Sequence, residues 1–329
     1  GHIRKVYMSH KVLVTGANGF LGKAVIRDLK KNNNYTVLPL KGRAQWDLTN
    51  QKHVDYVLKE MKPDTIIHLA AVCGGIGINR EQPGKFMYDN LSMGMNLIES
   101  CRKYEKLKKF IMVGTVCAYP KFTPVPFKEE DIWNGYPEET NAPYGIAKKT
   151  LMELLIAYNK QYGFNCTNLI PVNMYGPHDN FNPSSSHVIP ALMLKIDRAI
   201  QVGKNNIELW GTGNASREFL YVDDCAKAIT KSVEIDTTPE PINIGTGSEI
   251  TIKGLVTMMA KIMGYEGTIS YNSEFPDGQP RRCLDTNRAF QTLEFEASTE
   301  LYNGLKDTID WYYKNKGKEK FCDYFDHIQ

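Results

Sequence analysis

A glycine-rich turn near the start of the chain limits the folds open to it more than any other feature. Residues 15–22 read TGANGFLG, with glycines three residues apart. The turn follows an apolar run at residues 11–15, typical of a buried strand, and leads into an amphipathic stretch at residues 22–32, which predicts a helix. Glycines permit the tight turn and let backbone N–H groups approach a phosphate at the positive end of the helix. This unit predicts an α/β protein with an anion site at its first turn.

The first half of the chain repeats this alternation of short apolar runs and amphipathic stretches. Strands joined by helices pair in parallel through right-handed crossovers. The pattern therefore predicts a Rossmann-like, doubly wound parallel sheet. Strands are expected at residues 35–40, 65–70, 109–114 and 165–171, and helices at residues 51–61, 88–104 and 144–162.

Beyond about residue 175 the periodicity weakens, because prolines and Gly/Asn-rich turns interrupt it. We predict a Rossmann domain over residues 9–175, to which residues 215–248 return, and a smaller C-terminal substrate-binding lobe made of residues 176–214 and 249–320. In this part, helices are expected at residues 188–202, 224–235 and 252–263, and a strand at residues 242–245.

Charge and cysteine content exclude several classes of protein. The 40 basic and 37 acidic residues give a net charge of +3 with no basic run, which argues against a nucleic-acid partner. The seven cysteines are widely spaced and form no C-x-x-C pair, which favours reduced thiols and a cytoplasmic location over a disulfide framework or a zinc site. No apolar run approaches the roughly 18–20 residues of a membrane span, and the polar N-terminus does not resemble a signal peptide.

The end of the second expected strand indicates which dinucleotide binds. Residues 38–43 read LPLKGR, so Lys41 and Arg43 stand where an NAD-binding chain would carry an acid. Cations suit a 2′-phosphate, which favours NADP(H) over the alternative that both side chains are ordinary solvated charges. The other residues expected near the dinucleotide lie in the glycine turn and behind the second and third strands: Gly16, Asn18, Gly19, Phe20, Leu21, Gly22, Asp47, Leu48, Leu69, Ala70 and Ala71.

A Y-x-x-x-K pattern supplies the candidate redox chemistry. Tyr144 and Lys148 share one face of an expected helix, where the ammonium favours the phenolate and lowers the phenol pKa. Such a phenol can pass a proton to a carbonyl oxygen while hydride reaches the carbon. Thr115 follows another expected strand and can hydrogen-bond the same oxygen. Taken alone, the Tyr144–Lys148 pair could also be a surface contact, so the catalytic interpretation depends on the position of the pair in the fold.

Several longer motifs identify a family. From about residue 11 to residue 313 the chain resembles the extended short-chain dehydrogenase/reductases. Within them it resembles the branch that epimerises and reduces GDP-4-keto-6-deoxy-D-mannose with NADPH. The motifs are residues 70–76 (AAVCGGI), 113–121 (VGTVCAYPK), 143–148 (PYGIAK), 175–192 (YGPHDNFNPSSSHVIPAL), 210–224 (WGTGNASREFLYVDD) and 275–281 (FPDGQPR).

The resemblance implies a role for several side chains. Thr115, Tyr144 and Lys148 match the family's reductase triad, and Cys117 and His187 match its epimerase acid/base pair. Which of the pair is the base at each carbon stays open. The family usually has two serines before the cysteine, where this chain has Thr115 and Val116, so one neighbouring hydroxyl is missing.

The resemblance also implies binding residues and no metal. His178 and Asp179 lie near His187 and could suggest a metal, but the family uses none. Further cofactor contacts are implied at Val113, Gly114, Pro171, Asn173, Met174 and His187, and substrate contacts at Lys195, Trp210, Arg217 and Asp277.

The expected function is therefore two-step synthesis of GDP-L-fucose by epimerisation and reduction. A related enzyme acting on a dideoxy or heptose 4-keto substrate, as in GDP-colitose synthesis, remains an alternative. Two further alternatives are a non-catalytic NADP-binding protein and an epimerase that keeps its NAD bound. A non-catalytic protein of this kind usually loses the tyrosine or lysine that stand here as Tyr144 and Lys148. The epimerase does not fit the cations after the second strand. By resemblance, a homodimer is expected through the helices at residues 88–104 and 144–162.

Overall fold

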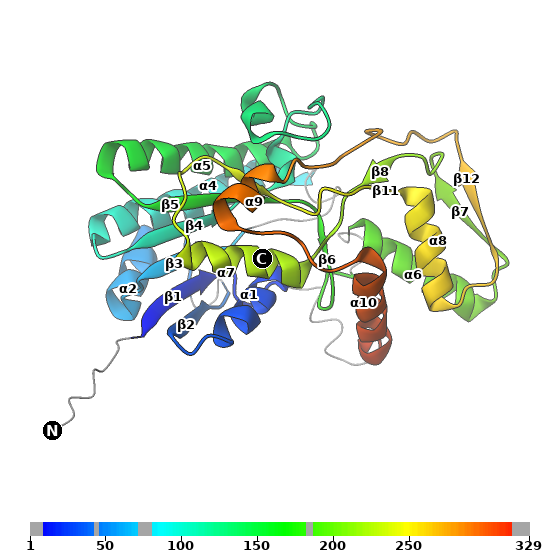
Figure 1. Ribbon diagram of the computed structural model, residues 1–329, viewed down its shortest axis with the longest axis horizontal. Coiled ribbons are helices and arrows are strands. Elements are labelled where there is room, and N and C mark those ends of the chain that lie inside the picture. Colours follow the sequence, from blue (N-terminus) through cyan, green and yellow to red (C-terminus); the bar gives the residue numbers. More distant parts are fainter. Residues whose placement is uncertain (1–8, 43–45, 72–80, 182–186, 318–329) are drawn as a thin grey trace.

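Six parallel strands form the central sheet of the computed structural model, which describes residues 9–42, 46–71, 81–181 and 187–317 (Figure 1). Their order across the sheet is β10-β5-β4-β3-β1-β2, and every pair is parallel. From β1 the chain first adds β2 on one side, and it then crosses back to add β3 on the other side of β1. The strand order therefore reverses between β1 and β3, and such sheets bind ligands in the crevice at this switch point. The strands are β1 (His10–Thr15), β2 (Tyr35–Leu40), β3 (Thr65–His68), β4 (Lys109–Val113), β5 (Cys166–Pro171) and β10 (Ile242–Ile244).

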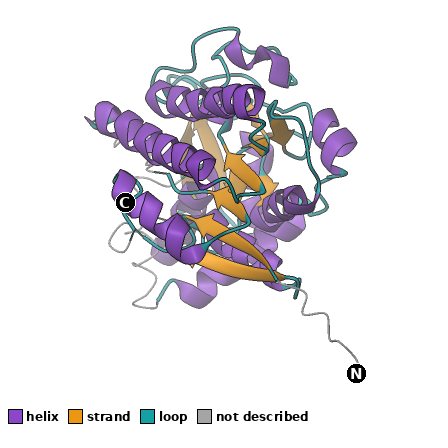
Figure 2. Cartoon of the chain, turned by 90° about the vertical axis from the view of Figure 1, so that its left-hand side faces the viewer, coloured by secondary structure: helices purple, strands orange, loops and turns teal. Residues whose placement is uncertain are grey.

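Helices cover both faces of this sheet (Figure 2). On one face α1 (Phe20–Lys30) packs against α7 (Val222–Glu234). On the other, α2 (Gln51–Met61) packs on α4 (Pro83–Tyr104), which packs on α5 (Ala142–Tyr162). Strands β3, β4 and β5 are buried along their whole length, which explains their continuous apolar sequence.

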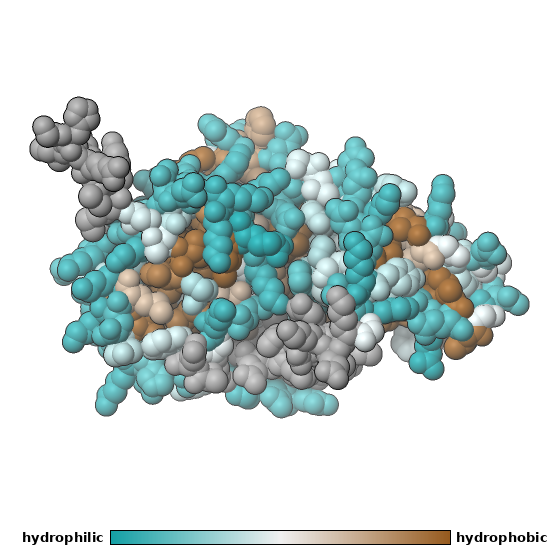
Figure 3. All heavy atoms as spheres, turned by 90° about the horizontal axis from the view of Figure 1, so that it is seen from below, coloured by the Kyte–Doolittle hydropathy of each residue, from teal (hydrophilic) through white to brown (hydrophobic). Residues whose placement is uncertain are grey.

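The C-terminal part builds a second core beside the first. Helices α6 (Val188–Val202), α8 (Ile252–Met263) and α10 (Leu301–Asn315) enclose it with the parallel pair β7 (Asn206–Trp210) and β12 (Thr268–Asn272). Seen from below, hydrophilic side chains cover most of the molecule, and hydrophobic ones are exposed toward both ends (Figure 3). The remaining elements are η1 (Val116–Ala118), η2 (Glu129–Trp133), β6 (Met174–Tyr175), β8 (Ser216–Arg217), β9 (Leu220–Tyr221), β11 (Ile250–Thr251) and α9 (Asn287–Leu293).

The expected elements are present with ends that differ by at most two residues, except at α4, and several further elements were not predicted. Helix α4 begins at Pro83, five residues before the expected start, because proline suits a first helical turn but breaks the apolar periodicity. Strand β3 ends at His68, before the expected residue 70. The two-residue strands were missed because they carry no periodic signal, and β7, β12, α9 and α10 were also not predicted. In the described residues, no helix is both long and apolar enough to cross a membrane.

Candidate active site

The glycine turn lies in the crevice between β1 and β3. Gly16 has a φ of +67°, and a Cβ there would be 2.8 Å from the amide nitrogen of Ala70. A Cβ on Gly22 would be 2.1 Å from the carbonyl oxygen of Gly16. Both positions therefore require glycine, and the turn brings the start of α1 against the end of β3, with Leu69 and Ala70 beside it.

A buried hydrogen-bond network fixes the two strand ends that flank this crevice. The Thr15 hydroxyl oxygen accepts bonds from the amides of Leu69 and Ala70, both at 3.0 Å, and lies 2.8 Å from Nδ1 of His68. A hydroxyl that accepts twice has one proton left to donate, so His68 Nδ1 is the acceptor. Complete burial holds the pKa of His68 well below its usual value, which fits a neutral imidazole. Sequence analysis did not single out this network.

The start of α1 suits the phosphates of a dinucleotide. The N-cap residue, Gly19, has no side chain to cap the helix, and the first turn contains no acidic residue. The backbone N–H groups and the helix dipole are thus open to an anion. Lys41 is exposed just beyond β2, and Arg43 lies outside the described residues. Asp47 accepts bonds from the amide and hydroxyl of Thr49, so its carboxylate helps to order the turn before α2.

The strand-end hydroxyl and the cysteine lie against the first turns of α5. The amide of Cys117, in η1, donates to the Thr115 hydroxyl oxygen at 3.1 Å, which leaves the hydroxyl proton able to bond a substrate oxygen. A Cβ on Gly145 would be only 2.4 Å from the Cys117 carbonyl oxygen. Tyr144 is half-buried beside that glycine, and Lys148 is buried one turn later. The structure thus brings Thr115, Cys117 and the Y-x-x-x-K helix together.

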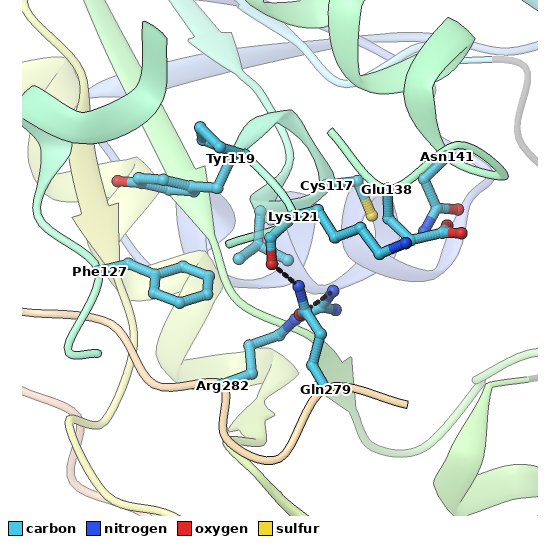
Figure 4. Close-up of a pocket in the computed structure, with 10 residues that line it drawn as sticks. Cys117, Tyr119, Lys121, Phe127, Glu138, Asn141, Gln279 and Arg282 are labelled. Carbon is cyan, nitrogen blue, oxygen red and sulfur yellow. Dashed lines mark hydrogen bonds between the residues drawn. The ribbon is translucent and has the colours of Figure 1, made fainter. Parts of the chain in front are cut away.

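Cys117 lines a pocket whose opposite wall comes from residues 279–282 (Figure 4). There Gln279 donates from its side chain to the Lys121 carbonyl oxygen, and Nη2 of Arg282 donates to Oε1 of Gln279 at 3.4 Å. Nε of Arg282 is buried and has no hydrogen-bond partner within the described residues. Gln279 and Arg282 were not predicted as site residues; only Asp277 was expected in this segment. The pocket is lined by Val116, Cys117, Tyr119, Pro120, Lys121, Phe127, Glu138, Asn141, Gln279 and Arg282.

His187 occupies the residue before α6 and does not line this pocket. It keeps an exposed surface, yet the protein around it lowers its pKa by desolvation, which favours the neutral imidazole at neutral pH. A neutral imidazole is able to accept a proton. Residues 182–186, which precede it in the predicted motif, lie outside the described residues.

The four residues expected to contact substrate lie in the C-terminal part. Lys195 is exposed on α6, and Trp210 is exposed at the end of β7. Nη1 of Arg217 donates to the carbonyl oxygens of Ser216 and Gln279, both at 2.7 Å, while burial lowers its pKa. Asp277 accepts from the Thr212 amide and hydroxyl, so in this structure it also ties two segments together.

Glu218, next to Arg217, is a buried carboxylate that sequence analysis missed. It accepts backbone N–H bonds from Thr246, Gly247 and Leu284, at 2.5 to 3.0 Å. Burial raises its pKa, and these bonds offset part of that rise. Because Leu284 follows the segment that carries Arg282, Glu218 fixes the pocket wall from behind. Its partners are distant in sequence, so no local pattern could have found it.

The residues at the ends of β4 and β5 that are expected to contact the cofactor are also close in space. The amide of Gly114 donates to the Leu169 carbonyl oxygen at 2.7 Å, just after Val113. Pro171 is the last residue of β5, and the carbonyl oxygen of Asn173 accepts from Leu220 before Met174 enters β6. No group of three or more His, Cys, Asp or Glu side chains in the described part of the chain is arranged to hold a metal ion.

Asp179 is a buried carboxyl whose titration should make the stability of the folded chain depend on pH. Its Oδ1 accepts from the Asn180 amide, but Oδ2 has no partner among the described residues, and burial raises its pKa to about 7 from 3.8. Between those values the folded state binds more protons than the unfolded state, so stability falls as pH rises from about 4 to 7. The free energy of unfolding falls by at most about 4 kcal/mol over this range.

We expect Asp179→Asn to remove this pH dependence. The melting temperature of the variant relative to the parent should rise by several degrees between pH 4 and pH 8, measured by differential scanning calorimetry in one ionic strength. Asp64→Asn, at a half-buried carboxylate bonded to the Lys11 amide, serves as a control. Parallel pH profiles for Asp179→Asn and the parent would contradict the assignment.

The family model described as the NAD dependent epimerase/dehydratase family matches residues 12–245, and the chain belongs to this family. Within it, as the motifs predicted, the chain is similar to GDP-L-fucose synthases. It is 38% identical over 307 residues to GDP-L-fucose synthase 1 of Arabidopsis thaliana, covering 93% of this chain and 94% of that protein. It is 35% identical over 311 residues to GDP-L-colitose synthase of Yersinia pseudotuberculosis, covering 94% and 100%. A solved GDP-L-fucose synthetase from Naegleria fowleri bound to NADP matches with a TM-score of 0.85 and 29% identity, covering 94% of each chain.

Proposed function

We propose that this protein is an NADPH-dependent enzyme that converts GDP-4-keto-6-deoxy-D-mannose to GDP-L-fucose. One observation carries the proposal: the close contact between Gly145 and Cys117, which joins the Y-x-x-x-K helix to the cysteine of the pocket. An enzyme that only reduced a ketone would not need a thiol at that place. The similarity to GDP-L-fucose synthases supports the same substrate.

Cys117 and His187 form the proposed acid/base pair for epimerisation. One of them removes the proton from a carbon beside the 4-keto group, and the electron pair of that bond moves into an enolate. The other returns a proton to the opposite face of the carbon, which inverts the centre. The two ring carbons flanking the ketone undergo this exchange in turn, with no net change in oxidation state.

Tyr144, Lys148 and Thr115 form the proposed reductase triad. When bound, NADPH supplies the hydride that reduces C4 of the sugar. The Tyr144 hydroxyl gives its proton to the developing alkoxide, the Lys148 ammonium stabilises the phenolate left behind, and the Thr115 hydroxyl donates a hydrogen bond to the same oxygen.

The residues at the sheet crevice fit a dinucleotide. Close approach at Gly16 and Gly22 leaves room only for backbone, and the first turn of α1 presents N–H groups without a competing acid. Lys41 and Arg43 are the proposed partners of the 2′-phosphate, which makes NADP(H) the cofactor rather than NAD. The NADP-bound relative supports this choice.

A dideoxy substrate is the second candidate. It is favoured by the similarity to a GDP-L-colitose synthase at nearly the same identity and full coverage. Both reactions use one epimerisation and reduction machinery, so turnover of the two 4-keto sugar nucleotides has to be compared directly.

Three broader features belong to the same proposal. The chain forms a homodimer through α4 and α5, which pack along each other on one face of the sheet. It acts in the cytoplasm, where its unpaired described cysteines would stay reduced. The sheet with its helices is the cofactor domain, and the second hydrophobic core marks the substrate-binding lobe.

Product analysis by NMR tests the function. With GDP-4-keto-6-deoxy-D-mannose and NADPH in deuterated water, we expect GDP-L-fucose with deuterium at both carbons that flanked the ketone. Cys117→Ser should abolish deuterium uptake while NADPH is still consumed, because the triad remains. Reduction by the parent without deuterium at either carbon would leave only a ketoreductase.

A further inference from the structure

Strands β7 and β12 lie at the outer end of the C-terminal lobe (Figure 1). An exposed pair of stacked aromatic rings follows them, Trp210 at the end of β7 and Phe275 just after β12. The ring centroids of Trp210 and Phe275 are 4.1 Å apart, and their planes differ by 7°. Trp210 is nevertheless 71% exposed, so one stacked face leaves much of the indole open to solvent. An open, flat aromatic surface of this kind suits a flat ligand.

Hydrogen bonds fix the two rings against each other. Asp277 accepts from the Thr212 amide at 2.7 Å and from its hydroxyl at 2.6 Å, which ties the turn after Trp210 to the segment that carries Phe275. Gly211, with a φ of +89°, leaves room for the Asp277 carboxylate, since a Cβ there would be 2.3 Å from Oδ1 of Asp277. The pair is therefore held in place before any ligand binds.

Residues 275–282, here called the connecting segment, run from this pair to the pocket of Cys117. Arg217 donates to the carbonyl oxygen of Gln279 at 2.7 Å, so its guanidinium lies along the middle of the segment. Gln279 and Arg282 then form the pocket wall opposite Cys117. A flat platform, a guanidinium and a reactive pocket thus follow in the order of the base, diphosphate and sugar of a nucleotide sugar.

We propose that Phe275 is a specificity-determining residue, which completes with Trp210 a two-ring platform on which the purine base of the substrate stacks. This inference rests on the proposed function. Phe275 covers one face of the indole, so the base stacks on the other face, and a purine overlaps more of an indole than a pyrimidine does. The platform therefore favours GDP-linked over UDP-linked sugars. Phe275 acts by holding the indole plane, and its loss leaves Trp210 mobile on an exposed edge.

Calorimetric titration of the full chain with GDP, UDP and NADPH tests this inference. Phe275→Ala should weaken GDP binding roughly three- to tenfold, reduce the preference for GDP over UDP, and leave the dissociation constant for NADPH unchanged. Phe275→Tyr should restore GDP binding. Phe290→Ala, at another exposed phenylalanine on α9, is the matched control and should bind all three ligands as the parent does.

Trp210→Ala separates failure of this inference from failure of the proposed function. If Trp210→Ala weakens GDP binding but Phe275→Ala does not, the role of Phe275 is overturned and the proposed function stands. If neither variant affects GDP binding, the nucleotide does not bind here and the assigned substrate contact at Trp210 fails as well. Equal weakening of GDP and NADPH by Phe275→Ala would indicate general structural damage and would also overturn the inference.

Discussion

Replacing Tyr144 by phenylalanine should lower the rate constant for ketone reduction by about 10²–10⁴-fold, the range expected when a general acid is removed. The variant deletes one oxygen and keeps the ring, which stays half-buried beside Gly145. The dissociation constant for NADPH should change little, because the glycine turn and the start of α1 are untouched. Single-turnover measurement of NADPH absorbance, with saturating cofactor, isolates the reduction.

Epimerisation should survive in this variant, since Cys117 and His187 remain. Deuterium uptake into the 4-keto sugar, followed by NMR without reduction, is the matching measurement. Tyr162→Phe is the control, because Tyr162 is exposed at the opposite end of the same helix and should react as the parent does. Unchanged reduction by Tyr144→Phe would remove the proposed redox role of Tyr144 and would require another group to donate the proton.

The parts of the fold and site that sequence predicted are those written in short, local patterns. The glycine pattern at residues 16–22 follows β1 and ends in the first turn of α1, and Thr115 follows β4, because each pattern is complete within one strand–turn–helix unit. Tyr144 and Lys148 share α5 for the same reason. Buried parallel strands have continuous apolar sequences that are easily recognised, so almost the whole sheet was predicted.

The parts that sequence missed depend on contacts between distant segments. Glu218 accepts from Thr246, Gly247 and Leu284, and Thr15 pairs with His68 from another strand. Arg282 reaches the pocket of Cys117 only because the chain returns to it 165 residues later. None of these pairings has a period or a spacing that a single sequence displays.

Gly145→Ala should produce the second large loss, through geometry rather than chemistry. The added Cβ would lie 2.4 Å from the Cys117 carbonyl oxygen, whereas ordinary contacts begin near 3.4 Å, so η1 and α5 must separate by about 1 Å. A misplacement of that size costs about 10²-fold in rate. Because Thr115 and Cys117 move relative to Tyr144, both deuterium uptake and NADPH oxidation should fall, unlike in Tyr144→Phe, where only reduction falls.

Stability should fall as well, by about 1–3 kcal/mol, as expected for overpacking. Gly84→Ala is the matched control and should keep both activities, because in the first turn of α4 the new Cβ would have no described atom within 4 Å apart from its chain neighbours and the helix's own backbone. Urea unfolding monitored by circular dichroism gives the stability change at the same protein concentration as the assays. If Gly145→Ala lost stability yet kept the parent's rates of deuterium uptake and NADPH oxidation, the contact between η1 and α5 would contribute to folding alone. Epimerisation and reduction would then not both depend on the relative position of η1 and α5.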